Sequence, residues 1–533
     1  MLRCVSGLLQ AWVVGSIFIG ASPGQASYRV LSRVQGIEGL SEGGTHVAVH
    51  VEAFQDINGD GALDIFGVLG DVVLALGDGR GGFRPWVAMP APRPRGWIGP
   101  DFGDVDGDGD CDVYCGILDF ANRDASDEVY INDGFGGFSV EGVGRVPQAG
   151  RDANVCELID VDGDGDLDVA LGGYLSWWVP GGRARNWIYL NDGSGRFYED
   201  ATRASLPAIS DDTQAIESDD IDGDGDVDLV FGNFAVGPLQ NQSRVNINDG
   251  SGHFASSQAF PANRAWVPRL FDMDGDGDLD IGFFARGLTV SLAPVLYEND
   301  GTGWFTDVSA GLPIGDFAGA DFGDVDGDGD IDIVCVAYPV DVGGGEVLSV
   351  FQWVNDGGGR FTDQSMDTMP VFSERTTWGA YQLSLARLAD LDMDGDLDIV
   401  LNPNVSMAPP SGYNPILWNM TRYVYPPAPA RIGQSYTVDF YARPGNVVLP
   451  AAAFAPARVE LPGIGVLGLD PASLIVGTAL RIPASGDKAS LTFQVPQDSS
   501  LVGRKLYWQG LEVDPQRAPF YFLTNTFEET IES

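Results

Sequence analysis

The chain has 533 residues, a formal net charge of −46 at pH 7 and 72 glycines. A chain of this length exceeds a single hydrophobic core, so we expect more than one domain. So large a negative charge argues against nucleic acids and anionic membrane surfaces as partners, because both are polyanions. Abundant glycine, frequent turn signals and scarce helical periodicity predict an all-β chain.

The N-terminal segment, residues 1–26, has the pattern of a secretory signal peptide. Arg3 supplies the positive start, Leu8 to Ile19 supply the apolar stretch, and Gly24, Gln25 and Ala26 form a small-residue cleavage site. This apolar run is short and broken, which disfavours a transmembrane helix, and no later stretch is long enough to span a bilayer. We therefore expect a protein that is secreted, extracellular or exposed at the cell surface.

One nine-residue acidic segment then occurs seven times, in the forms DINGDGALD, DVDGDGDCD, DVDGDGDLD, DIDGDGDVD, DMDGDGDLD, DVDGDGDID and DLDMDGDLD. Oxygen-bearing side chains recur at positions 1, 3, 5 and 9, with glycine at position 6. A hard cation needs this spacing, because several oxygens must converge where the chain turns sharply. Ca²⁺ fits better than Mg²⁺, which demands tighter octahedral geometry. We expect about seven structural Ca²⁺ sites, with water and the position-7 carbonyl completing the shell.

The predicted metal ligands are the side chains at positions 1, 3, 5 and 9 of each loop. They are Asp56, Asn58, Asp60 and Asp64 in loop one; Asp104, Asp106, Asp108 and Asp112 in loop two; Asp160, Asp162, Asp164 and Asp168 in loop three; Asp220, Asp222, Asp224 and Asp228 in loop four; Asp272, Asp274, Asp276 and Asp280 in loop five; Asp324, Asp326, Asp328 and Asp332 in loop six; and Asp390, Asp392, Asp394 and Asp398 in loop seven.

An EF-hand is the first alternative for these loops, and the residues that follow them argue against it. An EF-hand requires an acidic residue at position 12 and a helix after the loop. Position 12 here is Gly, Cys, Leu or Phe, and apolar residues flank position 9 in the alternation of a strand. Each loop is therefore predicted to join two strands.

A second signature follows each of the first six loops, for example INDGFGGF ending at Phe138 and LNDGSGRF ending at Phe197. Asp-Gly after a short apolar strand predicts a tight hairpin with positive φ at both turn residues. The seventh copy is reduced to LWNM, from Leu417 to Met420. Each unit thus carries four strands, which is the sequence form of a propeller blade.

These units resemble FG-GAP/VCBS repeats, the blades of the integrin α-subunit-type β-propeller, in a secreted bacterial form. The resemblance covers about residues 28–422 and implies a seven-bladed β-propeller. It also implies that the metal loops lie on one face of the disc and that ligands engage the opposite face. Asn58 and Met393 are small departures, and Met393, in place of a glycine, is expected to strain loop seven. Because the last hairpin is missing, we expect the strand near Tyr28 to Val34 to complete the seventh blade.

Residues 423–533 differ from the repeats and are predicted to form a C-terminal β-rich module. Pro-rich YPPAPA, from Tyr425 to Ala430, marks a linker, and the short strands that follow suffice for a small β-sandwich. The stretch from Leu461 to Leu474 resembles a C-terminal module of large secreted bacterial proteins. Attachment, sorting and capping all remain open as roles for it.

The cysteines leave two alternatives. Cys115 and Cys335 occupy the same repeat position, where other blades place Leu or Phe, so they are expected to be buried thiols. A disulfide from Cys156 to Cys111 or Cys115 is the alternative in an oxidising compartment.

No catalytic residue is assigned, because most candidate aspartates have a metal-binding explanation and the three histidines are expected to be structural or exposed. The face opposite the metal loops is the better place to seek a ligand, since exposed Trp and Arg often anchor binding sites. The candidates there are Trp97, Trp177, Trp178, Arg183, Arg185 and Trp266. The leading hypothesis is a non-catalytic binding, adhesion or scaffold protein whose partner is an extracellular protein or polysaccharide. A lectin is the alternative, and a polysaccharide lyase or hydrolase is a weaker one.

Overall fold

The computed structural model describes most of the repeats and most of the C-terminal part. The described residues are 28–29, 50–68, 72–80, 82–86, 97–117, 127–140, 142–147, 153–173, 185–209, 211–233, 242–261, 267–284, 294–309, 312, 317–341, 346–365, 383–403, 416–419, 423–426, 428–443, 445–461, 465–484, 488–513 and 521–533. The signal peptide predicted for residues 1–26 lies outside them.

The chain divides into two compact units. One contains Ser27–Asp392 with Leu397–Trp418, and the other contains Asn419–Ser533 with Met393–Asp396. Each is described by itself below.

The first unit consists of seven four-stranded antiparallel sheets. The strands that open them are β2 (His50–Gln55), β6 (Trp97–Gly103), β10 (Ala153–Ile159), β14 (Thr213–Asp219), β18 (Val267–Phe271), β22 (Phe317–Gly323) and β26 (Leu383–Ala389). The second strands are β3 (Asp64–Val68), β7 (Asp112–Ile117), β11 (Asp168–Gly173), β15 (Asp228–Asn233), β19 (Asp280–Phe284), β23 (Asp332–Asp341) and β27 (Asp398–Pro403).

The third strands are β4 (Val72–Gly77), β8 (Glu128–Asn132), β12 (Trp187–Asn191), β16 (Arg244–Asn248), β20 (Val295–Asn299), β24 (Glu346–Asn355) and β28 (Ile416–Asn419). The fourth strands are β5 (Phe83–Trp86), β9 (Phe138–Val140), β13 (Phe197–Tyr198), β17 (Phe254–Ala259), β21 (Phe305–Asp307), β25 (Phe361–Asp363) and, in the seventh sheet, β1 (Tyr28–Arg29). A four-residue helix, α2 (Gly142–Arg145), follows β9.

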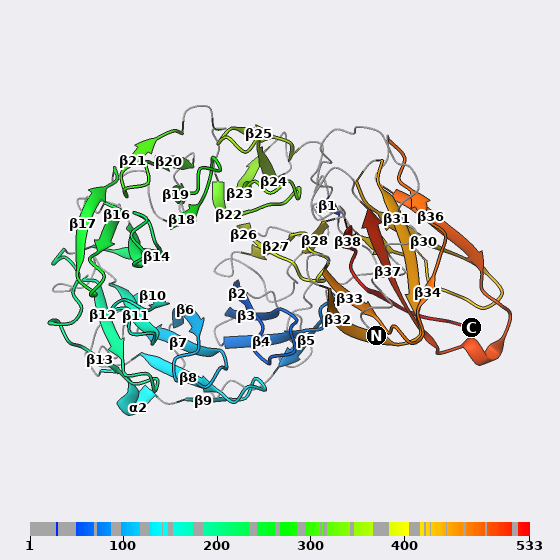
Figure 1. Ribbon diagram of the computed structural model, residues 1–533, viewed down its shortest axis with the longest axis horizontal. Coiled ribbons are helices and arrows are strands. Elements are labelled where there is room, and N and C mark those ends of the chain that lie inside the picture. The colour runs from blue at the N-terminus through cyan, green and yellow to red at the C-terminus, as the bar shows by residue number, and fades with distance from the viewer. Residues whose placement is uncertain are drawn as a thin grey trace. The chain divides into compact units, whose positions relative to one another are not determined.

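The sheets surround a central axis as the blades of a propeller, with the opening strands innermost (Figure 1). The prediction of an all-β propeller is therefore confirmed. The N-terminal strand also completes the seventh sheet as predicted, because β1 is the neighbour of β28 in that sheet.

The core of this unit lies between blades. Every residue of β11 and of β15 is buried, as expected for strands that are covered on both faces. Tyr114 and Val129 of the second blade pack with Leu158, Val169 and other apolar residues of the third in one cluster. The same arrangement continues into the fourth blade, so the apolar faces of neighbouring sheets bury one another.

The hairpins differ from their predicted turn. Asn132 pairs with Phe138, which leaves a loop of five residues, and only the glycines Gly134 and Gly136 have positive φ. Oδ1 of Asp133 accepts hydrogen bonds from the amides of Phe135 (3.0 Å) and Gly137 (2.9 Å). The prediction of positive φ at both turn residues was wrong, because Asp133 does not adopt positive φ. Its side chain instead caps a loop that is wider than a two-residue turn.

In blades two to six, an asparagine at the end of the third strand ties the blade to the preceding one. Nδ2 of Asn248 donates to the carbonyl of Val161 in the preceding blade (2.9 Å) and to that of Val227 in its own blade (3.2 Å). Equivalent bonds to the preceding blade are made by Asn132, Asn191, Asn299 and Asn355 at 2.7–2.8 Å. Blade one has Gly77 at this position. A Cβ there would lie 2.1 Å from the carbonyl oxygen of Leu63, so no side chain fits without a backbone shift.

The second unit is also built from strands. They are β29 (Val424–Tyr425), β30 (Ser435–Tyr441), β31 (Val447–Ala453), β32 (Pro456–Leu461), β33 (Gly465–Leu469), β34 (Ile475–Val476), β35 (Leu480–Arg481), β36 (Lys488–Gln494), β37 (Lys505–Val513), β38 (Tyr521–Leu523) and β39 (Phe527–Thr530), with a short 3₁₀ helix at Ser499–Leu501. A three-stranded and a six-stranded sheet share one core, in which Phe440 of β30 and Trp508 of β37 are buried. Two sheets that share an apolar core form a sandwich.

Candidate functional site

The seven acidic loops connect the first and second strands of their sheets. In every blade position 9 is the first residue of the second strand, so each loop leads into a strand and not into a helix. Glycines at positions 4 and 6 have positive φ, as at Gly107 (76°) and Gly109 (93°) in loop two. These two left-handed residues curl the loop back on itself.

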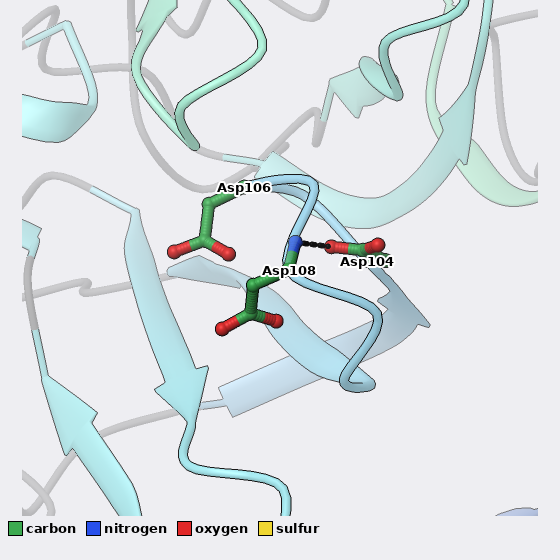
Figure 2. A group of neighbouring side chains, drawn as sticks. All are labelled: Asp104, Asp106 and Asp108. Atoms are coloured by element: carbon green, nitrogen blue, oxygen red, sulfur yellow. Dashed lines mark hydrogen bonds between the residues drawn. The ribbon is translucent and has the colours of Figure 1, made fainter.

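The position-1 carboxylate organises the backbone of loops one to six. Oδ1 of Asp104 accepts from the amides of Gly107 (2.7 Å) and Asp108 (3.1 Å), and Oδ2 accepts from Gly109 (2.9 Å). Figure 2 shows the bond from the Asp108 amide to Asp104, together with the neighbouring Asp106 carboxylate. The loop is thus held in its curled form by one of its own predicted ligands.

The position-9 carboxylate is the most deeply buried of each set. Asp112 Oδ2 accepts from the amide of Val105 (3.0 Å), and Oδ1 accepts from the amide of Asn132 (2.8 Å). Burial, partly offset by these amides, raises the pKa of Asp112 to about 6. It raises that of Asp168 to about 7 and that of Asp332 to about 8. Positive charge brought near these carboxyls would therefore stabilise their ionised form.

The predicted ligands come together in at least five loops. One oxygen of each of three aspartates lies within 4.8 Å of the other two in the groups Asp104–Asp106–Asp108, Asp160–Asp162–Asp168, Asp220–Asp222–Asp228, Asp272–Asp274–Asp276 and Asp324–Asp326–Asp332. Carboxylate oxygens that converge this closely repel one another unless a cation lies between them.

An orphaned atom at position 3 tests whether a metal fits these cages. Oδ1 of Asp106, Asp162 and Asp222 is buried and has no hydrogen-bond partner. A buried carboxylate oxygen without a partner is costly, and coordination of a cation would remove that cost. The donor set, made only of oxygens, is the one that Ca²⁺ prefers. The residues therefore fit a calcium ion.

Loops one and seven carry the two departures from the pattern. Asn58 Oδ1 in loop one accepts from the amide of Asp60 (2.9 Å), so the amide side chain takes the same local role as an aspartate. Met393 at position 4 of loop seven has φ of 61° and is the one non-glycine residue with positive φ in the described part of the chain. Such a conformation costs a side-chain-bearing residue about 1 kcal/mol or more, which agrees with the predicted strain.

The sequence predicted a second set of candidate residues, on the face opposite the metal loops, and the structure describes two of them. Arg185 is exposed just before β12, and Trp97 is the first residue of β6. Trp177, Trp178, Arg183 and Trp266 lie outside the described residues. Asp211 and Asp212, which directly precede β14, are buried. Nε of Arg244 donates to Asp211 Oδ2 (3.3 Å), and Gln214 Nε2 donates to Asp212 Oδ1 (3.0 Å).

A second polar feature, which the sequence reasoning missed, lines the propeller axis. It consists of the residues three positions before loops two to seven, which we call the axial ring: Asp101, Glu157, Glu217, Arg269, Asp321 and Arg387. Each lies on the innermost strand of its blade, and the six strands are β6, β10, β14, β18, β22 and β26. The equivalent residue of blade one is Ala53 on β2. Aligning the repeats on their loops would have shown this column of charges.

Residues of the axial ring link several blades to the next one. Asp101 Oδ2 accepts from the amide of Leu158 (2.6 Å), and Asp321 Oδ2 accepts from that of Leu388 (2.8 Å). Glu157 accepts from the hydroxyl of Ser218 in the next blade (2.9 Å).

Charges also meet across and around this ring. Arg269 Nη1 pairs with Glu217 Oε1, with about a fifth to a quarter of each side chain exposed. Burial raises the pKa of Asp101 to about 6, and burial followed by the charges of Asp101 and Glu217 raises the pKa of Glu157 well above its usual value. The pKa of Glu217 is raised by burial and lowered by Arg269 and by Arg387 of blade seven. The axial ring is therefore one coupled group of charges.

The cysteines of the repeats are free thiols. Cys115, Cys156 and Cys335 are buried and Cys111 is half-buried, and none of these four described residues forms a disulfide. Burial is the largest cause that raises the pKa of each thiol. Buried, protonated thiols act as small apolar side chains, as predicted for Cys115 and Cys335.

Within the described ranges, no helix is both long enough and apolar enough to cross a membrane.

Comparison with known proteins identifies the repeats. Residues 56–115 and 220–283 match the FG-GAP-like repeat. No curated protein matches the chain. Among solved structures, exo-β-1,3-galactanase of Phanerochaete chrysosporium with β-1,3-galactotriose is similar at 12% identity, over 78% of this chain and 96% of that chain, with a TM-score of 0.30. The β-fructofuranosidase of Aspergillus kawachii is similar at 10% identity, over 97% and 96% of the two chains, with a TM-score of 0.29. At these scores the likenesses carry no argument about function.

Proposed function

Since the chain carries FG-GAP-like repeats, we propose that it is a secreted, calcium-stabilised β-propeller that acts as a non-catalytic binding or adhesion scaffold. The observation that carries the metal part is the buried, partnerless Oδ1 of position 3 in loops two, three and four. The sequence features that support export are the apolar N-terminal segment and the need of the loops for a calcium-rich compartment.

Calcium in these loops is proposed to be structural. When bound it supplies positive charge to carboxylates that otherwise repel one another. Extracellular modules bind calcium with dissociation constants of about 10⁻⁴ to 10⁻³ M. At tenfold excess each site adds about 1.4 kcal/mol by linkage, so seven sites would add on the order of 10 kcal/mol.

Thermal unfolding in millimolar calcium and in EDTA tests this role. We expect a lower midpoint in EDTA, with magnesium restoring less of the loss than calcium does. An unchanged midpoint would contradict the proposal.

The proposed binding surface is the face opposite the calcium loops. In a four-stranded antiparallel blade the loops and the hairpins lie at one end of the strands, and the remaining connections lie at the other end. Trp177, Trp178 and Arg183 belong to one such connection in the sequence, and exposed Arg185 follows it. Trp and Arg supply large contact area and directional donors, which suits either a protein or a sugar partner.

Glycan-array binding and pull-down, each in calcium and in EDTA, distinguish the partners. The variant Trp177→Ala with Trp178→Ala should lose binding. Trp304→Ala is the matched control, because Trp304 is 56% exposed on a hairpin at the calcium-loop end. A glycan hit that the double variant abolishes would establish the lectin alternative, and binding that only Trp304→Ala abolishes would refute the choice of face.

A polysaccharide hydrolase or lyase is the second candidate, and the axial ring is the observation that favours it. Glycoside hydrolysis needs two carboxyl groups with different pKa values, and the raised pKa of Glu157 suits a general acid. It ranks second because Asp101, Glu157 and Asp321 already accept hydrogen bonds from the next blade. Release of reducing ends from plant and microbial polysaccharides, abolished by Glu157→Gln, would promote this candidate.

A further inference from the structure

Among the described residues, loop three is the acidic loop in which an arginine forms ion pairs with two of the carboxylates. Nη2 of Arg203 donates to Asp162 Oδ2 at 2.5 Å and to Asp164 Oδ2 at 3.3 Å. Asp162 and Asp164 are positions 3 and 5 of the loop. Their side chains are 7% and 37% exposed, and that of Arg203 is 45% exposed. The guanidinium thus covers two predicted calcium ligands from the solvent side.

The position of Arg203 is built into the fold. A turn closes when the amide of Arg203 donates to the carbonyl of Asp200 (3.0 Å), and Asp200 Oδ1 caps it by accepting from the Thr202 amide (2.9 Å). Nη1 of Arg203 donates to the hydroxyl of Tyr198 on β13 (2.7 Å). Two residues further on, the amide of Ser205 donates to the carbonyl of Gly252 in the hairpin of blade four (2.9 Å). Both ends of the arginine are therefore held in place.

Two opposite effects on the metal are possible in principle. A hydrogen bond to one carboxylate oxygen aligns the other oxygen for the metal, which strengthens binding. A fixed positive charge beside the metal weakens binding through repulsion.

Loop four separates these two effects. Asp222, at position 3 of that loop, holds its Oδ1 buried and without a partner, as Asp162 does. Within the described residues Asp222 forms no ion pair, and the charges that act on its pKa are those of Asp220 and Asp224. The fold therefore aligns position 3 without a guanidinium, and what Arg203 adds to loop three is its charge.

We propose that Arg203 is an internal counter-ion that competes with calcium in loop three, making it the low-affinity, calcium-responsive site among the loops. In the metal-free state the guanidinium balances part of the loop charge and keeps blade three folded. When calcium binds, Arg203 gives up its bond to Asp164. A guanidinium and a divalent ion that share a carboxylate are about 6 Å apart, and at the dielectric constant of water their repulsion weakens binding roughly tenfold. This inference rests on the proposed calcium binding.

Loop two has a milder version of this arrangement. Arg145 lowers the pKa of Asp106 by its charge, while its Nη1 donates to the carbonyl of Ser194. Loop four, where the described residues place no such cation, is the appropriate reference.

Hydrogen exchange followed by mass spectrometry across a calcium titration tests the proposal on the full chain. Amides inside each loop report on that loop alone: Gly165 donates to Asp160 in loop three (2.9 Å), and Gly225 donates to Asp220 in loop four (3.0 Å). We expect loop three to gain protection at a calcium concentration about tenfold above that of loop four. Arg203→Gln should bring the two midpoints together, and Arg203→Lys should keep them apart.

Arg196→Gln is the matched control. It removes the same charge from the same blade, but Nε of Arg196 donates to the carbonyl of Gly144 (3.2 Å). Among the described residues, Arg196 forms no ion pair with a loop-three carboxylate. An unchanged or higher loop-three midpoint in Arg203→Gln would overturn the proposal, as would an equal shift in Arg203→Lys or Arg196→Gln. If loops three and four respond together in the wild type, this inference alone fails; if no loop responds to calcium, the proposed metal role fails with it.

Discussion

Replacement of Asn248 by alanine tests whether the asparagines at the ends of the third strands hold neighbouring blades together. Asn248 is 4% exposed and makes three side-chain hydrogen bonds. It donates to the carbonyls of Val161 and Val227 and accepts from the amide of Gly252 (3.1 Å). Alanine leaves two carbonyls and one amide without these bonds. At about 1 kcal/mol for each buried group, the variant should lose about 3 kcal/mol of stability.

The assay is urea unfolding at saturating calcium, with the loss read from the midpoint at an unchanged slope. Asn248→Asp keeps the acceptor for Gly252 but sets a carboxylate against two carbonyl oxygens, so it should lose at least as much as alanine. Ser251→Ala, at an exposed position of the same hairpin, is the control and should change stability by less than about 0.5 kcal/mol. A loss below that size in Asn248→Ala, or a wild-type midpoint in Asn248→Asp, would refute the reasoning.

The axial ring gives two further predictions. Burial raises the pKa of Asp101 to about 6, above the usual 3.8. The folded state therefore binds this proton more tightly than the unfolded state does. The ionised carboxyl lowers the stability of the protein by its full amount once the pH exceeds about 6. Asp101→Asn should therefore be more stable than the wild type at pH 7.5, with an advantage that shrinks as pH falls from about 6 to 4; a difference that is constant across a series of thermal melts would contradict this. Arg269→Met leaves the Glu217 carboxylate without its ion-pair partner and should cost about 1–3 kcal/mol, a value reduced because both side chains are partly exposed. Adding Glu217→Gln should recover most of that loss in urea unfolding, and additive losses would show that the pair is not coupled.

The loops and the propeller were readable from the sequence because their determinants are local and repeated. Glycine at position 6 and oxygen side chains at positions 1, 3 and 5 fix a loop within nine residues. The strand that begins at position 9 follows from alternation alone. The place of the N-terminal strand was predictable by counting the strands of each repeat. The seventh repeat ends at LWNM without a hairpin and so lacks a fourth strand, and the segment at Tyr28 was the one strand not assigned to a repeat.

Features that depend on neighbouring blades were not readable in this way. Glu157 and Glu217 look like ordinary exposed charges on a strand, and only the convergence of the innermost strands makes them one coupled group. The pairing of Arg203 with Asp162 joins residues about 40 positions apart through the turn at Asp200. The error in the hairpin has a local cause. The Asp-Gly pair is a familiar signal for a two-residue turn, but the side chain of Asp133 caps a wider loop.

The junction between blades seven and one is joined differently from the other blade junctions. Gly77 replaces the asparagine there, so blade one lacks the side-chain hydrogen bond that blades two to six make to the preceding blade. The polypeptide itself bridges this junction, because β1 belongs to the sheet of β28 and the chain then continues into blade one. β1 must therefore wait during synthesis for its partner β28, which begins at Ile416. Closure of the circle is the longest-range step in its folding, and a chain cut short before that strand would remain an open arc.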